Sequence, residues 1–353
     1  MNTHRIGLAA ALGAALVSLV ACSGGAASVK ATPAAAPSTT TAATATAKVR
    51  PDPKAVSVGY TPLLINAPFY YGIEKGYFLD EGIDLKLQRI APGTDVLTQT
   101  AAGNFNIGSA GIGAAGFNLA AAAIKEKRVV PFEVVAPLHV ERAPAATPLV
   151  VSKARFESGE ITKVSDLKGK RTAINNKGSA TEYWLNIALK SGGLSVKDVT
   201  VVTMGFQDMA AALQNKSIDG AMLGEPMTTQ AKDLGLVRVL TDTFANNEAA
   251  TAVYWNRDWA AKNPQLADGF LRAFLKSAGE MEKSGWDDAG TIAIIEKYAQ
   301  VPADVIKRAS RPHYDAQGKL DPNGWRALES YFRSQSELTY EGNIDLNAFM
   351  RMK

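Results

Sequence analysis

Two loops rich in hydroxyl and amide side chains offer the first candidates for chemistry. The first runs from Thr61 to Tyr70 and contains Asn66 and Phe69. It combines a hydroxyl, an amide and two aromatic rings, a mixture that holds a small solute by shape and a few hydrogen bonds. Phe69 and Tyr70 are also typical of an ordinary hydrophobic core, and the residue types leave both alternatives open.

The second loop, from Asn175 to Thr181, directly precedes an expected helix. Either Ser179 or Thr181 can cap that helix with its hydroxyl. The remaining N–H groups and the positive end of the helix dipole favour an anionic or strongly polar ligand group. Capping alone explains both hydroxyls equally well, so a ligand role for Ser179 and Thr181 is one of two interpretations.

Glu225 lies between a glycine and a proline, after one expected strand and at the start of a helix. That position places its carboxylate at the mouth of a cleft, where it can accept hydrogen bonds from an amine, an amidine or a hydroxyl. The same carboxylate can instead complement the N-terminus of the helix. Both interpretations of Glu225 stay open.

A run of small residues from Ser109 to Gly113, including Ala110, lets a ligand approach the backbone closely. Its glycines lack the spacing of a dinucleotide fingerprint, and no acidic ribose ligand follows at the required distance. The run therefore predicts contact with a ligand through Ser109 and Ala110, and it argues against a nicotinamide or flavin enzyme.

The chain has three histidines, His4, His139 and His313, and one cysteine. No pair has metal-ligand spacing, and no nucleophile, histidine and acid form a recognisable triad. His139 is placed to reach the cleft, although a structural role suits it equally. We therefore expect a protein that is no enzyme and that holds no metal and no cofactor.

Strands that alternate with helices must position these loops. The first unit is expected to have strands at 56–60, 83–90 and 105–110, with helices at 68–75 and from Thr94 to 102. The second is expected to have strands at 171–174, 199–204, 220–223 and 237–240, with helices at 179–190, 209–215 and from 227. This alternation predicts parallel pairing in open α/β sheets. Ligands bind beyond the carboxyl ends of such strands, which is where the candidate loops lie.

The region after Thr251 reads as helical, with expected helices at 264–284, 287–299, 302–310 and 323–336. These helices need a sheet to pack on. If the chain leaves the first lobe near Val150 and returns near Ala250, they cover that lobe and leave a cleft between two lobes. The expected division is lobe 1 at 55–150 plus 250–353, and lobe 2 at 151–249.

The N-terminus predicts export. Residues 1–21 have one arginine and an apolar run too short to span a membrane, as in a secretory signal peptide. Leu-Val-Ala-Cys resembles a bacterial lipobox, in which Cys22 is acylated. Residues 22–54 are rich in Ala, Thr, Ser and Pro and predict a flexible linker. We therefore expect a lipid-anchored, extracytoplasmic protein.

The net charge of +4 is modest, and its lysines and arginines are scattered among acidic residues. No basic stripe of the kind that nucleic acid requires is present in the sequence. We therefore set nucleic-acid binding aside and expect a monomer with a small-molecule partner.

The chain resembles the solute-binding proteins for nitrate, sulfonates and taurine, a family that also includes thiamine-pyrimidine binders. The segments that carry the resemblance are Gly59-Tyr60, 68–72, 75–78, 81–83, 103–108, 166–170, 218–220 and Glu225-Pro226. It implies a bilobal, type II periplasmic-binding-protein fold, with two crossovers between the lobes and a ligand cleft between them. It also implies hinge closure on the ligand and hand-over to an ABC permease and its ATPase.

By the same resemblance, Thr61, Asn66, Phe69, Tyr70 and Ser109 would line the cleft from lobe 1, and Ser179, Thr181 and Glu225 from lobe 2. Sulfonate binders often present an aromatic where this chain has Glu225, and the expected loops hold no arginine. A small organic nitrogen or sulfur compound is the first expectation, and a heterocycle the alternative. A biosynthetic enzyme of the same fold and a ligand-sensing subunit are the rival classes.

Overall fold

The computed structural model describes residues 50–90, 95–283 and 285–352. The expected signal peptide, Cys22, the linker up to residue 49 and Thr94 lie outside the described residues. In the described part, no helix combines the length and the apolar character that crossing a membrane requires.

The first sheet has the strand order β2-β1-β3-β12-β4. Its strands are β1 (Lys54–Tyr60), β2 (Ile83–Arg89), β3 (Ile107–Gly111), β4 (Phe132–Pro137) and β12 (Thr251–Asn256). Strand β1 runs parallel to β2 and β3, and β12 runs antiparallel to both β3 and β4. This sheet places the carboxyl ends of β1 and β3 next to each other, because Tyr60 pairs with Ser109.

The second sheet has the strand order β10-β6-β9-β7-β8. Its strands are β6 (Leu149–Ser152), β7 (Arg171–Ile174), β8 (Thr200–Thr203), β9 (Gly220–Met222) and β10 (Val237–Thr241). Strand β7 runs parallel to β8 and β9, whereas β6 runs antiparallel to β9 and β10.

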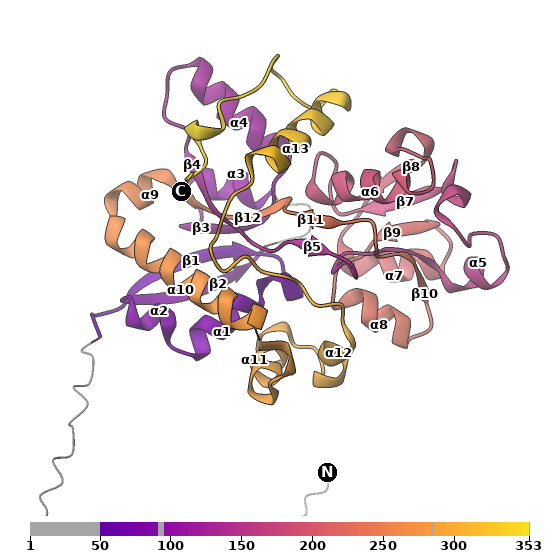
Figure 1. The fold of residues 1–353 in the computed structure, drawn as a ribbon, viewed down its shortest axis with the longest axis horizontal. Helices are drawn as coiled ribbons and strands as arrows, with labels where there is room; N and C mark the ends of the chain where they lie inside the picture. Colours follow the sequence, from indigo (N-terminus) through magenta and orange to yellow (C-terminus); the bar gives the residue numbers. More distant parts are fainter. Residues whose placement is uncertain (1–49, 91–94, 284, 353) are drawn as a thin grey trace, which may run out of the picture. The chain divides into compact units, whose positions relative to one another are not determined.

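Both sheets are therefore mixed, although the strands that the sequence predicted run parallel to one another within each sheet, as expected. The antiparallel strands are β6 and β12, which follow the two segments of chain that pass between the sheets. A strand that arrives from another sheet needs no helical crossover within its new sheet, so nothing forces it to run parallel to its neighbours. The passing segments themselves pair as a two-stranded ribbon of β5 (Glu141–Arg142) and β11 (Asn246–Glu248), drawn between the two sheets in Figure 1.

Helices follow most of the strands. They are α1 (Ala67–Glu74), α2 (Tyr77–Asp80), α3 (Val96–Ala101), α4 (Ala114–Lys125), α5 (Lys153–Glu157), α6 (Ala180–Lys190), α7 (Phe206–Gln214) and α8 (Met227–Asp233). Short 3-10 turns lie at Leu64–Asn66, Val164–Leu167, Val196–Asp198, Gly285–Asp287 and Leu346–Ala348. Asp95, rather than Thr94, caps α3, because its side chain accepts a hydrogen bond from the Thr98 N–H at 2.8 Å.

The C-terminal part contains α9 (Arg257–Lys262), α10 (Pro264–Lys283), α11 (Ala289–Ala299), α12 (Ala303–Arg308) and α13 (Pro322–Ser334). Helices α10 and α11 pack on α1, as expected of helices that cover the first sheet. Helix α12 also packs on α8, and α13 packs on both α4 and α6. The C-terminal helices therefore contact helices that flank both sheets, where the sequence predicted cover of the first lobe alone.

Candidate functional site

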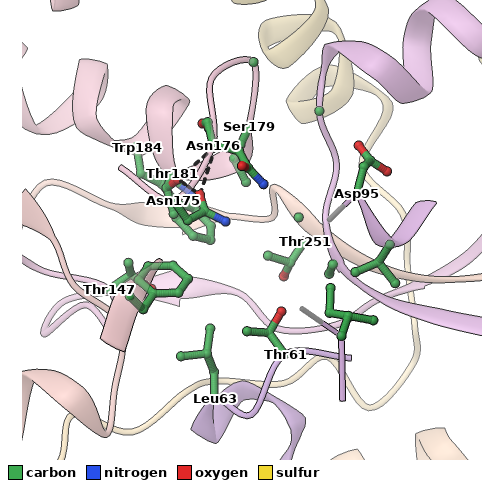
Figure 2. Close-up of a pocket in the computed structure, with 18 of the residues that line it drawn as sticks. Thr61, Leu63, Asp95, Thr147, Asn175, Asn176, Ser179, Thr181, Trp184 and Thr251 are labelled. Atoms are coloured by element: carbon green, nitrogen blue, oxygen red, sulfur yellow. Dashed lines mark hydrogen bonds between the residues drawn. The ribbon is translucent and has the colours of Figure 1, made fainter. Parts of the chain in front are cut away.

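A cavity of about 420 Å³ lies where the loops of the two sheets meet (Figure 2). Elements of the first sheet contribute Thr61, Leu63, Ile65, Asn66, Ile90, Asp95, Val96 and much of 109–115. Elements of the second sheet contribute 175–181, Trp184, Thr203 and Phe206, while Thr147 comes from the first passing segment and Thr251 begins β12. Six residues expected at a ligand site line this cavity, namely Thr61, Asn66, Ser109, Ala110, Ser179 and Thr181.

Asn66 and Ser109 form the first-sheet side of the cavity. The Asn66 amide donates to the Thr61 carbonyl at 2.7 Å, and its oxygen accepts from the Ser109 hydroxyl at 2.6 Å. Both side chains are buried, so these bonds hold the loop after β1 against the end of β3. The pairing of β1 with β3 brings the two loops together, as the rule on strand ends predicts.

Asn175, Ser179 and Thr181 form a hydroxyl and amide cluster on the opposite side. Asn175 Oδ1 accepts from the Thr181 hydroxyl, and Ser179 Oγ donates to the Asn176 carbonyl at 2.6 Å, as the dashed lines in Figure 2 show. Ser179 occupies the N-cap position of α6, yet its side chain makes no capping hydrogen bond. Capping therefore does not account for either hydroxyl in this structure.

The two sides touch at one edge of the cavity. The Ala114 N–H, at the start of α4, donates to the Gly178 carbonyl at 2.8 Å. A β-carbon on Gly111 would lie 2.9 Å from the β-carbon of Ala180, so the small residues after β3 permit this approach. The run of small residues thus serves contact between the two sheets' loops as well as the cavity lining.

The cavity carries few charges. Among the described residues, Asp95 and Lys177 are the only charged ones in its lining, and Lys177 is exposed. Apolar side chains line the cavity beside the polar clusters, namely Trp184, Phe206, Leu63 and Ile65. An apolar wall with a few convergent polar groups suits an organic molecule, held by shape and by hydrogen bonds.

Phe69 and Tyr70 lie in the core and do not line the cavity. The Phe69 ring lies 5.1 Å from that of Phe274, and the Tyr70 ring stacks on Tyr298 at the same distance. Both side chains are fully buried, and this burial raises the pKa of the Tyr70 phenol well above its usual value. The expectation that this pair lines the cleft is corrected, because α1 turns these rings toward α10 and α11.

Glu225 also lies outside the lining. Its carboxylate accepts from the Thr229 N–H at 3.1 Å, from the Thr229 hydroxyl at 3.0 Å and from the Ser310 N–H at 3.2 Å. Burial raises the pKa of this carboxyl group, while the three hydrogen bonds act in the opposite direction. The structure thus favours the helix-capping alternative for Glu225 over a place at the cleft mouth.

His139 lies behind the cavity, where its ring contacts the edge of Trp184 at 5.7 Å between centroids. It reaches the lining through the hydroxyl of Thr251, 2.7 Å from its Nδ1. His139 is itself fully buried and is absent from the lining.

The sequence analysis missed several lining residues, and a signal existed for some of them. Thr203 is the last residue of β8 and Phe206 begins α7 just after it, so the rule on strand ends applies to them as well. Trp184 lies three residues after Thr181 on α6, which places the two on one helix face. Thr147 comes from the first passing segment and Thr251 begins β12, and no local pattern marks either residue.

The NMT1-like family model matches residues 49–289. A riboflavin-binding protein, RibY, of Chloroflexus aurantiacus is 29% identical over 251 residues, 70% of this chain and 67% of that protein. The nitrate/nitrite-binding protein NrtA of Synechococcus elongatus is 24% identical, over 79% of this chain and 66% of that one. These matches confirm the family resemblance drawn from the sequence.

Among solved structures, the alkanesulfonate-binding protein SsuA of Xanthomonas axonopodis pv. citri, bound to MOPS, has a TM-score of 0.64. The alignment has 20% identity and covers 83% of this chain and 96% of that one. The desulfurization enzyme DSZB is also similar, with a TM-score of 0.58, 13% identity and coverage of 85% and 97%. The chain thus has the bilobal periplasmic-binding-protein fold expected from the sequence. The sequence relatives named above are binding proteins, and an enzyme can share the fold.

Proposed function

The chain belongs to the NMT1-like family, and from this premise we propose that it is the solute-binding subunit of an ABC importer. In this role it captures a small molecule and delivers it to a membrane permease that an ATPase drives. The observation that carries the proposal is the cavity of about 420 Å³ whose lining comes from the strand-end loops of both sheets. A ligand held from both sides favours the closed state in proportion to the contacts that it makes only there.

We place the two lobes at 55–150 plus 250–353 and at 151–249, one around each sheet. The ribbon of β5 and β11 is then the hinge, because both passing segments run through it. Hinge closure brings Thr61, Asn66, Ser109 and Ala110 against Ser179 and Thr181, and these six residues form the proposed binding site.

A small organic nitrogen- or sulfur-containing molecule is the proposed solute. The cavity volume lies in the range of roughly 300–1,000 Å³ that is typical of organic ligands. No arginine of the described part of the chain lines it to pair with a sulfonate or a nitrate, so hydrogen bonds and apolar contact must supply most of the affinity. Trp184 and Phe206 favour the alternative of a heterocycle, which the likeness to a riboflavin-binding protein also supports.

The proposal includes export and a lipid anchor. Residues 1–21 would be the signal peptide, Cys22 the acylated residue and 23–54 a flexible linker that lets the folded part reach the permease. The location would be extracytoplasmic. Metabolic labelling with a radioactive fatty acid tests this part, since Cys22→Ser must abolish the label if Cys22 is acylated.

Thermal shift of residues 50–353 tests the binding role. The panel is taurine, other aliphatic sulfonates, nitrate, amino-pyrimidines, riboflavin and small carboxylates. Binding in the cavity raises the melting temperature by mass action, and analysis of the recovered compound must show it unaltered. Turnover of a compound would establish an enzyme instead, and no shift with any compound would contradict the proposed solute class.

A further inference from the structure

Three buried groups behind the cavity form a relay that ends in a cavity hydroxyl. His139 Nε2 lies 3.3 Å from Glu141 Oε1, and His139 Nδ1 lies 2.7 Å from Thr251 Oγ1. The side chains of His139 and Glu141 are 0% and 1% exposed. Thr251 lines the cavity, and Figure 2 shows its hydroxyl turned toward that of Thr61.

The second oxygen of Glu141 fixes which way the relay runs. Glu141 Oε2 accepts a hydrogen bond from the Ala146 N–H at 2.8 Å, so this carboxylate is held as an acceptor. Its Oε1 and the His139 Nε2 are both buried, and neither has a hydrogen-bond partner among the described residues, because the 3.3 Å contact between them misses hydrogen-bond geometry. Their contact is long and imperfectly aligned, but a proton on Nε2 is the arrangement that satisfies both atoms.

The tautomer of His139 then decides what Thr251 can offer. A neutral imidazole with its proton on Nε2 has an unprotonated Nδ1, which is an acceptor. The Thr251 hydroxyl must therefore donate its one proton to Nδ1. The Thr251 oxygen then has only lone pairs to offer in the cavity, so it can accept a hydrogen bond from a ligand but cannot donate one.

We propose that the pair Glu141 and His139 fixes Thr251 as a hydrogen-bond acceptor in the cavity, so that the bound solute presents an N–H or O–H group there. This inference rests on the proposed function, because it concerns the solute of the same cavity. Thr251 is the specificity-determining residue, and His139 and Glu141 are positioning residues that act through it. Trp184 supports the arrangement, since its ring packs edge-on against His139.

The relay also joins one passing segment to the first sheet. His139 and Glu141 belong to the first passing segment, with Glu141 in β5, and Thr251 begins β12. A solute that binds Thr251 thus contacts a network that reaches one strand of the proposed hinge.

The substitution Glu141→Gln reverses the relay with little change in shape. The Ala146 N–H requires an acceptor, so the glutamine carbonyl takes the place of Oε2 and its NH₂ group faces His139. Nε2 must then accept, the imidazole proton moves to Nδ1, and Thr251 accepts from it. The Thr251 proton becomes free to donate into the cavity.

Long-range proton–nitrogen NMR of the full chain labelled with [15N]histidine tests the relay without any solute. The chain holds three histidines, and the signals that disappear in His139→Gln identify this residue. We expect the Nε2-protonated tautomer in the unsubstituted protein and the Nδ1-protonated tautomer in Glu141→Gln. An imidazolium or an Nδ1-protonated ring in the unsubstituted protein would overturn the proposal.

Matched probe pairs test the consequence for binding, namely taurine against ethanesulfonate, 4-aminopyrimidine against 4-methoxypyrimidine, and riboflavin against its N3-methyl derivative. For the pair that binds, we expect Thr251→Val to lower the affinity for the donor-bearing member about tenfold and to leave the affinity for the other member nearly unchanged. Thr251→Ser, which keeps the hydroxyl, should restore the preference, and Glu141→Gln should shift it toward the acceptor-bearing member.

Two outcomes separate the inference from the proposed function. If Thr251→Val lowers the affinity for both members of a pair equally, the acceptor role of Thr251 is overturned while the binding function stands. Failure of every probe to bind would count against the proposed function, and the tautomer of His139 would still decide the relay.

Discussion

A β-carbon placed on Gly113 would lie 2.3 Å from the carbonyl oxygen of Gly178. The two glycines belong to loops from different sheets, and the same oxygen accepts the N–H of Ala114 at 2.8 Å. No side chain at position 113 can coexist with this contact, since real β-carbons do not approach an oxygen so closely. We propose that this contact forms when the two lobes close around the cavity.

Gly113→Ala should weaken solute binding about tenfold or more and leave the melting temperature of the ligand-free protein within a few degrees. Gly113 has an extended backbone, with φ −122° and ψ 175°, which alanine adopts without strain. The added methyl group opposes closure only, so the solute loses part of its contacts. Calorimetric titration with a solute found by thermal shift measures the affinity.

Gly116→Ala is the matched control, because it adds the same methyl group to α4, the helix that Gly113 precedes. The three atoms nearest to its β-carbon would all belong to Leu97, on the first-sheet side, with the first of them 3.0 Å away. Equal weakening by Gly113→Ala and Gly116→Ala would refute the closure argument.

Glu225→Gln should lower the stability of the fold and leave solute affinity unchanged. All three hydrogen bonds to the carboxylate come from Thr229 and Ser310, and an amide NH₂ would face one of these donors. A buried mismatch of this kind costs about 1–3 kcal/mol. Urea denaturation measures the loss, and a weakened affinity at unchanged stability would return Glu225 to the binding site.

The sequence predicted the elements with clear local periodicity, such as β7 and the helices α6 and α10. It missed β6 and β12, whose residues are buried on both faces and therefore show no alternation of polar and apolar side chains. Without these strands the mixed character of the sheets could not be deduced.

The site was predictable where it depends on strand ends and not where it depends on side-chain direction. Ser109 and Ser179 were found because Ser109 lies near the carboxyl end of a predicted strand and Ser179 lies in the loop after another. Phe69 and Glu225 follow strands as well, yet packing turns the ring toward α10 and the carboxylate toward α8. Thr251 depends on a pairing between segments far apart in the sequence, which no single-sequence pattern contains.

Asp95→Asn should raise the affinity for an anionic probe such as ethanesulfonate about three- to tenfold, and lower that for amines. Asn caps a helix as well as Asp, so the bond from Thr98 is kept and only the charge changes. Removal of the one negative charge in the lining acts on charged solutes over several ångströms. Glu341→Gln makes the same charge change at an exposed position outside the lining, and an identical effect there would indicate a general change in net charge.

The stability of the protein should fall as pH rises from about 4.5 to 7, and Glu337→Gln should remove part of this fall. Burial first, and repulsion from Glu182 second, raise the pKa of the Glu337 carboxyl from 4.5 to about 7. Its oxygens have no hydrogen-bond partner among the described residues, so only the weaker attraction to Lys177 favours the charged form. A raised carboxyl pKa in the folded state means that the folded protein binds the proton more tightly than the unfolded chain does. The contribution of Glu337 to the stability of the fold is therefore complete below pH 4.5 and is lost as the pH rises through 7.

Because Glu337 is only half-buried, solvent screening reduces the effect, and we expect Glu337→Gln to be about 1–2 kcal/mol more stable than the unsubstituted protein at pH 8. At pH 5 the two proteins should be nearly equal, since Glu337 is then protonated in the fold. Urea midpoints measured at intervals between pH 4 and pH 8 provide the comparison. Parallel curves for the two proteins would show that the pH dependence comes from other groups. A larger difference at pH 5 than at pH 8 would contradict the raised pKa itself.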